Sequence, residues 1–200
     1  MKRFLILLVL VTQWSCGQKK MELKGDTEWQ NEKNAQFKDA STSPLTKKDL
    51  RTFEGLDFFE FDSTYVVNAF LERTPNTEWF KMKTTTDRLS EERVYGILQF
   101  EIGDQSFSLN VYQGKENMQT EGYEDYLFLP YLDNTNGVTS YGGGRYIDLR
   151  IPKGNEIIVD FNKSYNPLCV YNKRYSCPIV PRINYMDIEV KAGMKDYKKE

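Results

Sequence analysis

The sequence contains no histidine. Histidine is the side chain that most often serves as a general base or a metal ligand near neutral pH. Its absence excludes the Ser-His-Asp and Cys-His mechanisms of nucleophilic catalysis. Because no other catalytic motif is recognisable, we assign no catalytic residue, no metal and no cofactor, and we leave open whether the protein is an enzyme.

The apolar run at the start of the chain is too short to span a bilayer, which needs about 20 apolar residues. This run, residues 4–11, follows Lys2 and Arg3 and leads into a short polar stretch, residues 12–15. A basic start, a short apolar segment and a polar exit are typical of a removable secretory signal. We therefore predict a signal peptide over residues 1–15 and export of the mature chain.

Cys16 follows the predicted signal directly, with Ser15 before it and Gly17 after it. This arrangement resembles the lipobox of bacterial lipoproteins, whose cysteine is acylated and becomes the new N-terminus. Gln13 and Trp14 depart from that pattern, which prefers an aliphatic and a small residue, and an ordinary secretory signal is the alternative. The resemblance implies lipidation at Cys16, a lipid membrane as partner and a place in the cell envelope, periplasmic or on the outer surface.

Cysteine is scarce, with three residues in the chain. In an exported protein, an odd cysteine needs a role other than pairing within the chain. Cys169 and Cys177 can pair with each other while Cys16 takes the lipid. The two could instead bind a metal, but a zinc site normally needs further cysteine or histidine ligands, so a disulfide is favoured in an oxidising compartment.

The excess of acidic over basic residues is small. Removing Lys2 and Arg3 with the signal changes the formal net charge from −2 to −4, since 25 basic and 29 acidic residues remain. A mildly acidic chain lacks the basic surface that nucleic acid requires. We therefore expect no nucleic-acid partner.

The remaining composition indicates one β-rich domain. Removing 15 of the 200 residues leaves 185, the usual size of a single domain. The 13 Tyr and 12 Phe, together with abundant Val, Ile and Thr, favour strands. We predict a mainly β, single antiparallel domain, sandwich or barrel-like, over residues 44–195, preceded by a lipid-anchored tether with a weak helix over residues 16–43.

The chain outside the strands has few regular elements. Thr46 is suited to cap a short helix over residues 47–54, which Gly55 would end. Residues 163–184 show no period and predict a long ordered loop. Residues 185–192 alternate well enough to predict a final strand.

Two pairs of strand-like runs predict hairpins. Residues 65–73 and 79–86 are separated by a Thr-Pro-Asn turn. Residues 98–102 and 107–111 alternate between apolar and polar side chains around Gly103. The second pair is the clearest structural signal in the chain.

Residues 146–151 and 157–162 alternate in the same way and predict a third hairpin around Gly154. In that register Asp148 and Asp160 face each other about 5 Å apart, away from the aliphatic side chains. Opposed carboxylates need a cation, a shared proton or an arginine. The pair could serve acid/base chemistry or cation binding; the favoured alternative is a structural network that an arginine neutralises.

Residues 141–145, Tyr-Gly-Gly-Gly-Arg, place free backbone amides beside a guanidinium. Such a turn could bind a carboxylate or phosphate, so a small anionic or polar ligand is the expected partner. The alternative is that the glycines have no ligand and form the turn that leads into a strand, where unusual backbone angles are needed.

An ordered set of short strings runs from Ser43 to the C-terminal tail. These strings are similar to the bacterial domain-of-unknown-function family 1684, and that resemblance implies a fold and recurrent polar residues but no established activity. The strings are Ser43-Pro44-Leu45, Glu72-Arg73-Thr74-Pro75, Tyr95-Gly96 with Phe100, Val111-Tyr112-Gln113, Tyr141-Gly142-Gly143-Gly144-Arg145-Tyr146, Asp160-Phe161-Asn162, Tyr165-Asn166-Pro167 with Cys169, Cys177-Pro178 and Ala192-Gly193.

The resemblance also implies a set of candidate residues. The chain departs from the family at four positions that usually carry Arg, Glu, Arg and Glu, namely Leu132, Ile183, Tyr185 and Met194. With Asp148 added from the third predicted hairpin, the candidate binding residues are Asp133, Arg145, Tyr146, Asp148, Asp160, Asn162, Tyr165, Asn166 and Asn184, beside the cysteines Cys169 and Cys177.

We interpret the chain as an exported lipoprotein that serves as a non-catalytic binding or structural module. Its polar cluster of Arg, Asp, Asn and Tyr is the expected site. The alternatives are a hydrolase that uses Asp148 and Asp160 as paired carboxylates, and a scaffold partner in an envelope complex.

Overall fold

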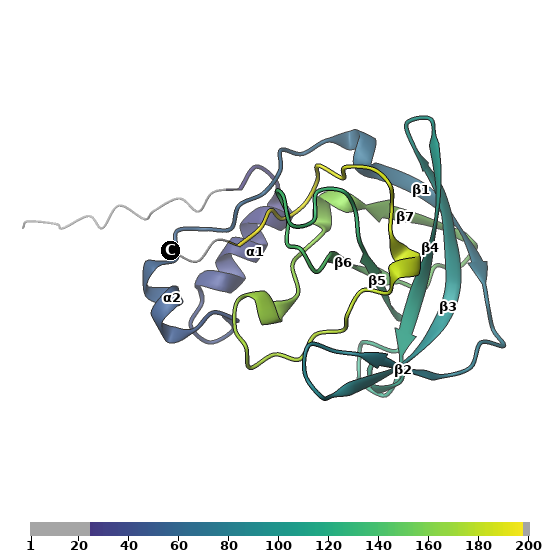
Figure 1. The fold of residues 1–200 in the computed structure, drawn as a ribbon, viewed down its shortest axis with the longest axis horizontal. Coiled ribbons are helices and arrows are strands. Elements are labelled where there is room, and N and C mark those ends of the chain that lie inside the picture. The colour runs from purple at the N-terminus through teal and green to yellow at the C-terminus, as the bar shows by residue number, and fades with distance from the viewer. Residues whose placement is uncertain (1–24, 198–200) are drawn as a thin grey trace, which may run out of the picture.

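The structure, a computed structural model, describes residues 25–197. Its centre is an antiparallel sheet that curls into a half-barrel (Figure 1), with strand order β6-β5-β4-β3-β1-β7 and β2 beside β3. The predicted mainly β class is confirmed. The elements are α1 (Glu28–Lys38), α2 (Lys47–Thr52), β1 (Val66–Arg73), β2 (Phe80–Lys83), β3 (Leu89–Ile102), β4 (Gln105–Gly114), α3 (Lys115–Met118), β5 (Tyr126–Tyr131), β6 (Arg145–Arg150), β7 (Glu156–Asp160) and four short 3-10 turns.

One face of the sheet packs into the main hydrophobic core. Successive side chains of a strand point to opposite faces, so alternate residues such as Leu71, Leu98 and Leu127 are buried there. The C-terminal segment covers this core. Residues 185–192 form no strand, which corrects the prediction, and instead cross the core as an extended cover in which Met186 and Val190 are fully buried.

The clearest predicted hairpin is confirmed. β3 and β4 pair around Gly103, with Phe100 opposite Phe107. Gly103 has a φ of 59°, in the left-handed region that glycine adopts without steric cost.

The other two predicted hairpins are wrong. β1 pairs with β3 and β7, and β2 pairs with β3, so residues 65–73 and 79–86 are not partners. β6 and β7 lie at opposite edges of the sheet. Alternation predicts which face of the sheet each side chain takes, but it does not predict which strand pairs with which. Here the long strand β3 pairs with both β1 and β2 along one edge.

A β-bulge in β3 reverses the faces of its side chains. Val94 pairs with Tyr112 while Gly96 pairs with Val111, so β3 has one extra residue at this point. Even-numbered residues after the bulge point into the main core. Before it, Glu92 and Val94 lie on the opposite face, the face of Tyr112.

The helices pack beside the sheet through a second core. α1 begins with a capping box in which the side chains of Thr27 and Gln30 satisfy each other's backbone N–H groups. Its Phe37 meets Tyr171 edge to face, with ring centroids 4.7 Å apart. α2 begins at its predicted cap, Thr46.

Part of the predicted tether therefore packs onto the domain, since α1 falls within residues 16–43. The predicted signal peptide and Cys16 lie outside the described residues. Between residues 25 and 197, no helix is long and apolar enough to cross a membrane.

Candidate functional site

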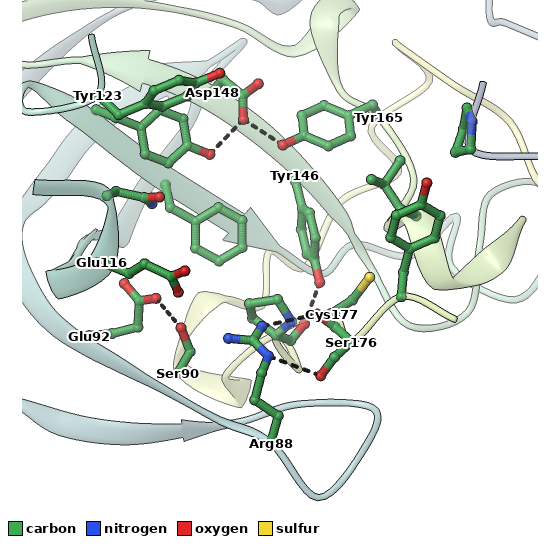
Figure 2. Close-up of a pocket in the computed structure, with 18 of the residues that line it drawn as sticks. Arg88, Ser90, Glu92, Glu116, Tyr123, Tyr146, Asp148, Tyr165, Ser176 and Cys177 are labelled. Atoms are coloured by element: carbon green, nitrogen blue, oxygen red, sulfur yellow. Dashed lines mark hydrogen bonds between the residues drawn. The ribbon is translucent and has the colours of Figure 1, made fainter. Parts of the chain in front are cut away.

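A cleft of about 800 Å³ opens on the second face of the sheet. In β6, Ile147 and Leu149 point into the main core, whereas Tyr146 and Asp148 line the cleft, so their predicted faces are confirmed. The start of β3, α3, strands β5 and β6, α1 and the loop of residues 165–178 surround this cleft (Figure 2). Its volume suits a small molecule.

Aromatic rings form one wall of the cleft. Phe128 and Tyr146 meet edge to face with centroids 4.7 Å apart, and Tyr146 meets Tyr165 in the same way at 5.8 Å. The Tyr146 hydroxyl donates to the carbonyl oxygen of Pro178, which fixes the ring against the loop. The wall is therefore a firmly held apolar surface.

Asp148 is exposed and accepts hydrogen bonds from two phenols. The Tyr126 hydroxyl donates at 2.8 Å and the Tyr165 hydroxyl at 2.5 Å (Figure 2). Burial, reinforced by the charge of Asp148, raises the pKa of both phenols above the usual range of tyrosine. Both tyrosines therefore stay protonated as donors and orient the carboxylate.

Glu92 is the buried carboxylate of the cleft, with 5% of its surface exposed. Its Oε1 accepts a 2.7 Å hydrogen bond from the Ser90 hydroxyl, while its Oε2 has no partner within the described residues. Burial raises the pKa of Glu92; Ser90 and Arg88 oppose that rise, and Glu116 of α3 adds to it. A buried carboxylate with a perturbed pKa in a cleft is typical of a functional site.

Asn166 supplies a second acceptor without a donor. Its Nδ2 donates to the carbonyl oxygen of Lys195 at 2.8 Å and to the Tyr171 hydroxyl at 3.3 Å, which fixes the orientation of the amide. Its Oδ1 is buried and has no partner in the part of the chain that the structure describes. Asn166 and Glu92 both line the cleft, so two residues of the site each hold a buried acceptor without a donor.

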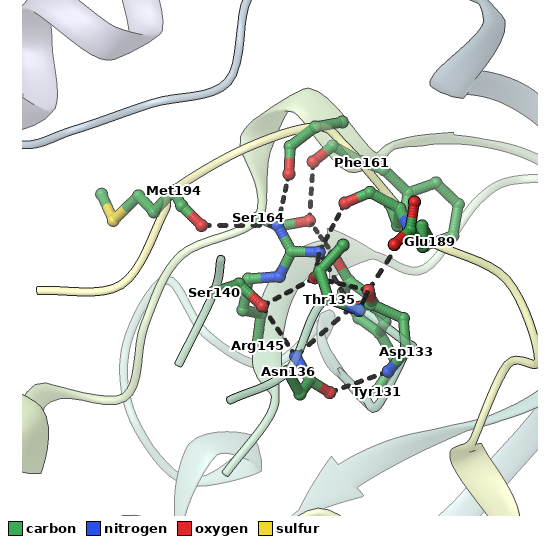
Figure 3. A network of polar contacts seen from close by, with 12 residues as sticks. Tyr131, Asp133, Thr135, Asn136, Ser140, Arg145, Phe161, Ser164, Glu189 and Met194 are labelled. Carbon is green, nitrogen blue, oxygen red and sulfur yellow. Dashed lines mark hydrogen bonds and ion pairs between the residues drawn. The ribbon is translucent and has the colours of Figure 1, made fainter. Parts of the chain in front are cut away.

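Asp133 and Arg145 form an ion pair elsewhere in the fold (Figure 3). Arg145 Nη2 lies 2.9 Å from Asp133 Oδ2, and both side chains are fully buried. The guanidinium also donates to the carbonyl oxygens of Val190 and Ala192. The pair ties the C-terminal segment onto the sheet, and its guanidinium is enclosed by protein groups.

The glycine run before Arg145 forms the turn that leads into β6. This is the alternative that the sequence left open. Gly144 has a φ of 89°, and a Cβ there would lie 2.6 Å from the carbonyl oxygen of Tyr131. Only glycine fits this close approach.

Two asparagines that were predicted to bind a ligand instead join segments of backbone. Asn162 accepts from the Asp62 N–H at 3.0 Å and donates to the Asp62 carbonyl oxygen at 2.9 Å. Asn184 makes the same exchange with Asn110 at 2.9 and 2.8 Å. Both amides replace missing backbone partners.

The predicted face-to-face pair of Asp148 and Asp160 does not form. Asp148 lies on β6 and Asp160 at the end of β7, on opposite edges of the sheet. Asp160 accepts from the backbone N–H of Asn162 at 3.0 Å and lies 3.8 Å from Lys163 Nζ, in a separate hollow. The prediction failed because the hairpin on which it depended does not exist.

Cys169 and Cys177 are adjacent free thiols, so the predicted disulfide is not seen. The Cys169 N–H donates to Cys177 Sγ at 3.1 Å. Burial raises the pKa of Cys177 to about 12, so this cleft residue is a protonated thiol at neutral pH.

Sequence reasoning missed Glu92, Glu116 and Tyr126. The pairing shift at the β3 bulge places Glu92 in the cleft, and a bulge is invisible to an alternation count. The one local signal was Gly96, since an isolated glycine within a strand pattern indicates a bulge or a close approach.

The comparisons with known proteins agree with this fold. A family described as a protein of unknown function, DUF1684, matches residues 51–195. The chain is also similar to the solution NMR structure of an uncharacterized protein of Haloarcula marismortui, with a TM-score of 0.65 and 30% identity over 83% of this chain and 89% of that chain. No curated protein matches.

Proposed function

The chain belongs to the DUF1684 family of unknown function, and we propose that it is an exported, lipid-anchored binding protein that holds a small polar ligand in the cleft. Export and acylation of Cys16 rest on the signal pattern of residues 1–16. The lipid would make the membrane a partner of the protein and place the cleft in the cell envelope.

One observation carries the binding role, namely that two residues of one cleft each hold a buried acceptor without a donor. Glu92 Oε2 and Asn166 Oδ1 both lack a partner among the described residues. Leaving a buried polar group unsatisfied costs about 1–3 kcal/mol, and native folds hold few such groups. A ligand with hydrogen-bond donors would relieve both.

The side chains around these acceptors support binding over catalysis. The Cys177 thiol is protonated at neutral pH because burial raises its pKa to about 12. Tyr126 and Tyr165 are donors to Asp148. These groups can orient a ligand, but none of them is an activated nucleophile.

A paired-carboxylate hydrolase is the second candidate, with Glu92 in place of Asp160. Glu92 is buried and its pKa is raised, whereas Asp148 is exposed. Two carboxylates in unlike environments can divide acid and base roles. Release of nitrophenol from chromogenic glycosides, lost in Glu92→Gln, would favour the enzyme; no release favours the binding protein.

A thermal-unfolding screen of the full chain tests the binding role. Its panel contains organic amines, neutral sugars, organic anions and divalent cations. We expect one class to raise Tm, because a ligand at 100 times its Kd adds about 2.7 kcal/mol, and we expect Asn166→Leu to reduce that rise. A panel without any stabilising class would overturn the proposal.

Metabolic labelling with an alkyne fatty acid tests the anchor. The wild-type chain and Cys169→Ser should carry the label, and Cys16→Ser should not. Label retained by Cys16→Ser, or absent from the wild type, would contradict the lipid anchor.

A further inference from the structure

The chemistry of the cleft narrows the ligand class. We propose that the ligand is a protonated organic amine whose ammonium group lies against the carboxylate of Glu92. This inference rests on the proposed binding function and goes further by assigning the charge and the contact point of the ligand.

Glu92 is the side chain that selects for a cation. It is 95% buried, it forms no ion pair with any described residue, and its Oε2 lacks a donor (Figure 2). A neutral donor would satisfy that oxygen, but only a cation would also balance the charge that burial leaves poorly solvated. An ammonium group supplies both, since it carries three N–H donors and a full positive charge.

The surrounding charges leave the cleft negative. Four carboxylates and three cationic side chains line it. Lys115 Nζ already pairs with Glu91 at 3.2 Å, and Arg88 donates to Ser176 at 3.0 and 3.2 Å. Arg88 acts on Glu92 as a positive charge and Glu116 as a negative one. Neither Arg88 nor Lys33 forms an ion pair with Glu92 among the described residues, so a cation in direct contact with Glu92 is the missing partner.

The aromatic wall indicates that the cation is organic. Phe128, Tyr126 and Tyr146 line the same cleft as Glu92. Aromatic rings attract ammonium groups through their negative faces and cover the carbon atoms next to them. A bare metal ion gains little from an apolar wall, because it needs oxygen, nitrogen or sulfur ligands.

Asn166, which also lines the cleft, favours a ligand with more than one donor. Its Oδ1 is an acceptor, as Glu92 Oε2 is, and no described residue donates to it. A ligand with several donors suits a cleft whose unpaired groups are acceptors, whereas an anion would add further acceptors. Diamines and amino sugars are therefore the favoured ligand types, and their size fits the cleft of about 800 Å³.

The test uses two pairs of probes that differ in their charge. Glucosamine and glucose share a ring, and putrescine and 1,4-butanediol share a chain, so within each pair a protonated amine replaces a neutral hydroxyl. Isothermal titration of the full chain at pH 7 should show each amine binding at least about tenfold more tightly than its neutral counterpart.

Glu92→Gln should weaken both amines at least about tenfold and leave the neutral probes unchanged. Glu101→Gln is the matched control, because Glu101 lies on the same strand and also accepts from a serine hydroxyl, at 3.4 Å, but is exposed outside the cleft. Circular dichroism of both variants checks that they fold.

The outcomes separate the two proposals. If glucose, acetate or calcium binds and neither amine does, the amine inference fails while the binding function stands. If no probe of any class binds, both fail. Amines that bind wild type and Glu92→Gln equally would overturn the placement of the ammonium group at Glu92.

Discussion

Glu92 lies directly across from Gly114 in the β3–β4 ladder, and a Cβ on Gly114 would lie 3.1 Å from both carboxylate oxygens of Glu92. Gly114 has a φ of −87°, which any residue can adopt. Glycine at this position therefore provides space for the carboxylate rather than an unusual backbone angle.

Gly114→Ala should displace the Glu92 carboxylate by a few tenths of an ångström, because contacts of 3.1 Å are too tight. Putrescine affinity, measured by isothermal titration, should fall by about threefold or more. Gly154→Ala is the control, since a Cβ there meets no atom within 4 Å. Unchanged affinity in Gly114→Ala would contradict the position assigned to the carboxylate.

Glu92→Gln should stabilise the ligand-free protein at alkaline pH. Burial raises the pKa of Glu92 above its ordinary 4.5, so the folded protein binds the proton more tightly than the unfolded chain. The free energy of unfolding therefore falls as pH rises from about 4.5 through the raised value.

The expected gain for Glu92→Gln at pH 8 is about 1 kcal/mol, or about 2–4 °C in Tm. Below the ordinary pKa of glutamate, the charge is absent from both states and the difference should vanish. Thermal unfolding at pH 4 and pH 8 checks this, with Glu101→Gln as the control. A variant less stable than wild type at pH 8 would contradict an uncompensated charge.

Breaking the Asp133–Arg145 ion pair should destabilise the fold. Both side chains are fully buried, and removing one partner of such a pair costs about 3–5 kcal/mol. Urea unfolding of Arg145→Met should show this loss. The double variant Asp133→Asn with Arg145→Met should be more stable than Arg145→Met, because no unpaired charge remains and the asparagine oxygen still accepts from the N–H groups of Thr135 and Val190. Additive losses would argue against the coupling.

Gly144→Ala should also destabilise the fold, through its backbone. Position 144 has a φ of 89°, and a Cβ there would lie 2.6 Å from the Tyr131 carbonyl oxygen. An alanine would therefore push the turn before β6 away from the backbone of Tyr131. We expect a loss of about 2 kcal/mol or more in the free energy of unfolding. Gly154→Ala should be neutral in the same urea experiment.

The sequence was informative wherever local chemistry decides the structure. The Thr46 cap and the Gly103 turn depend on neighbouring residues and were predicted. The faces of Tyr146 and Asp148 follow from strand alternation, and they too were predicted. Family resemblance marked Asp133 and Arg145, but their role as a buried clamp appeared only in the fold.

Strand partners and the β3 bulge could not be predicted from local pattern. β6 and β7 are neighbours in sequence and lie at opposite edges of the sheet, because pairing depends on contacts between distant segments. One extra residue between Val94 and Gly96 moves Glu92 from the core face to the cleft. The candidate site therefore depends on tertiary pairing.

The contact between an ammonium group and Glu92 is tested most directly by titrating putrescine into the full chain from pH 4 to pH 8. Arg88, Ser90 and Glu116 act on Glu92, and its proton must leave before the cation binds. Affinity should rise with pH through the raised pKa of Glu92 and then level off, while Glu92→Gln binds weakly at every pH. Equal, pH-independent affinity in both proteins would contradict the account.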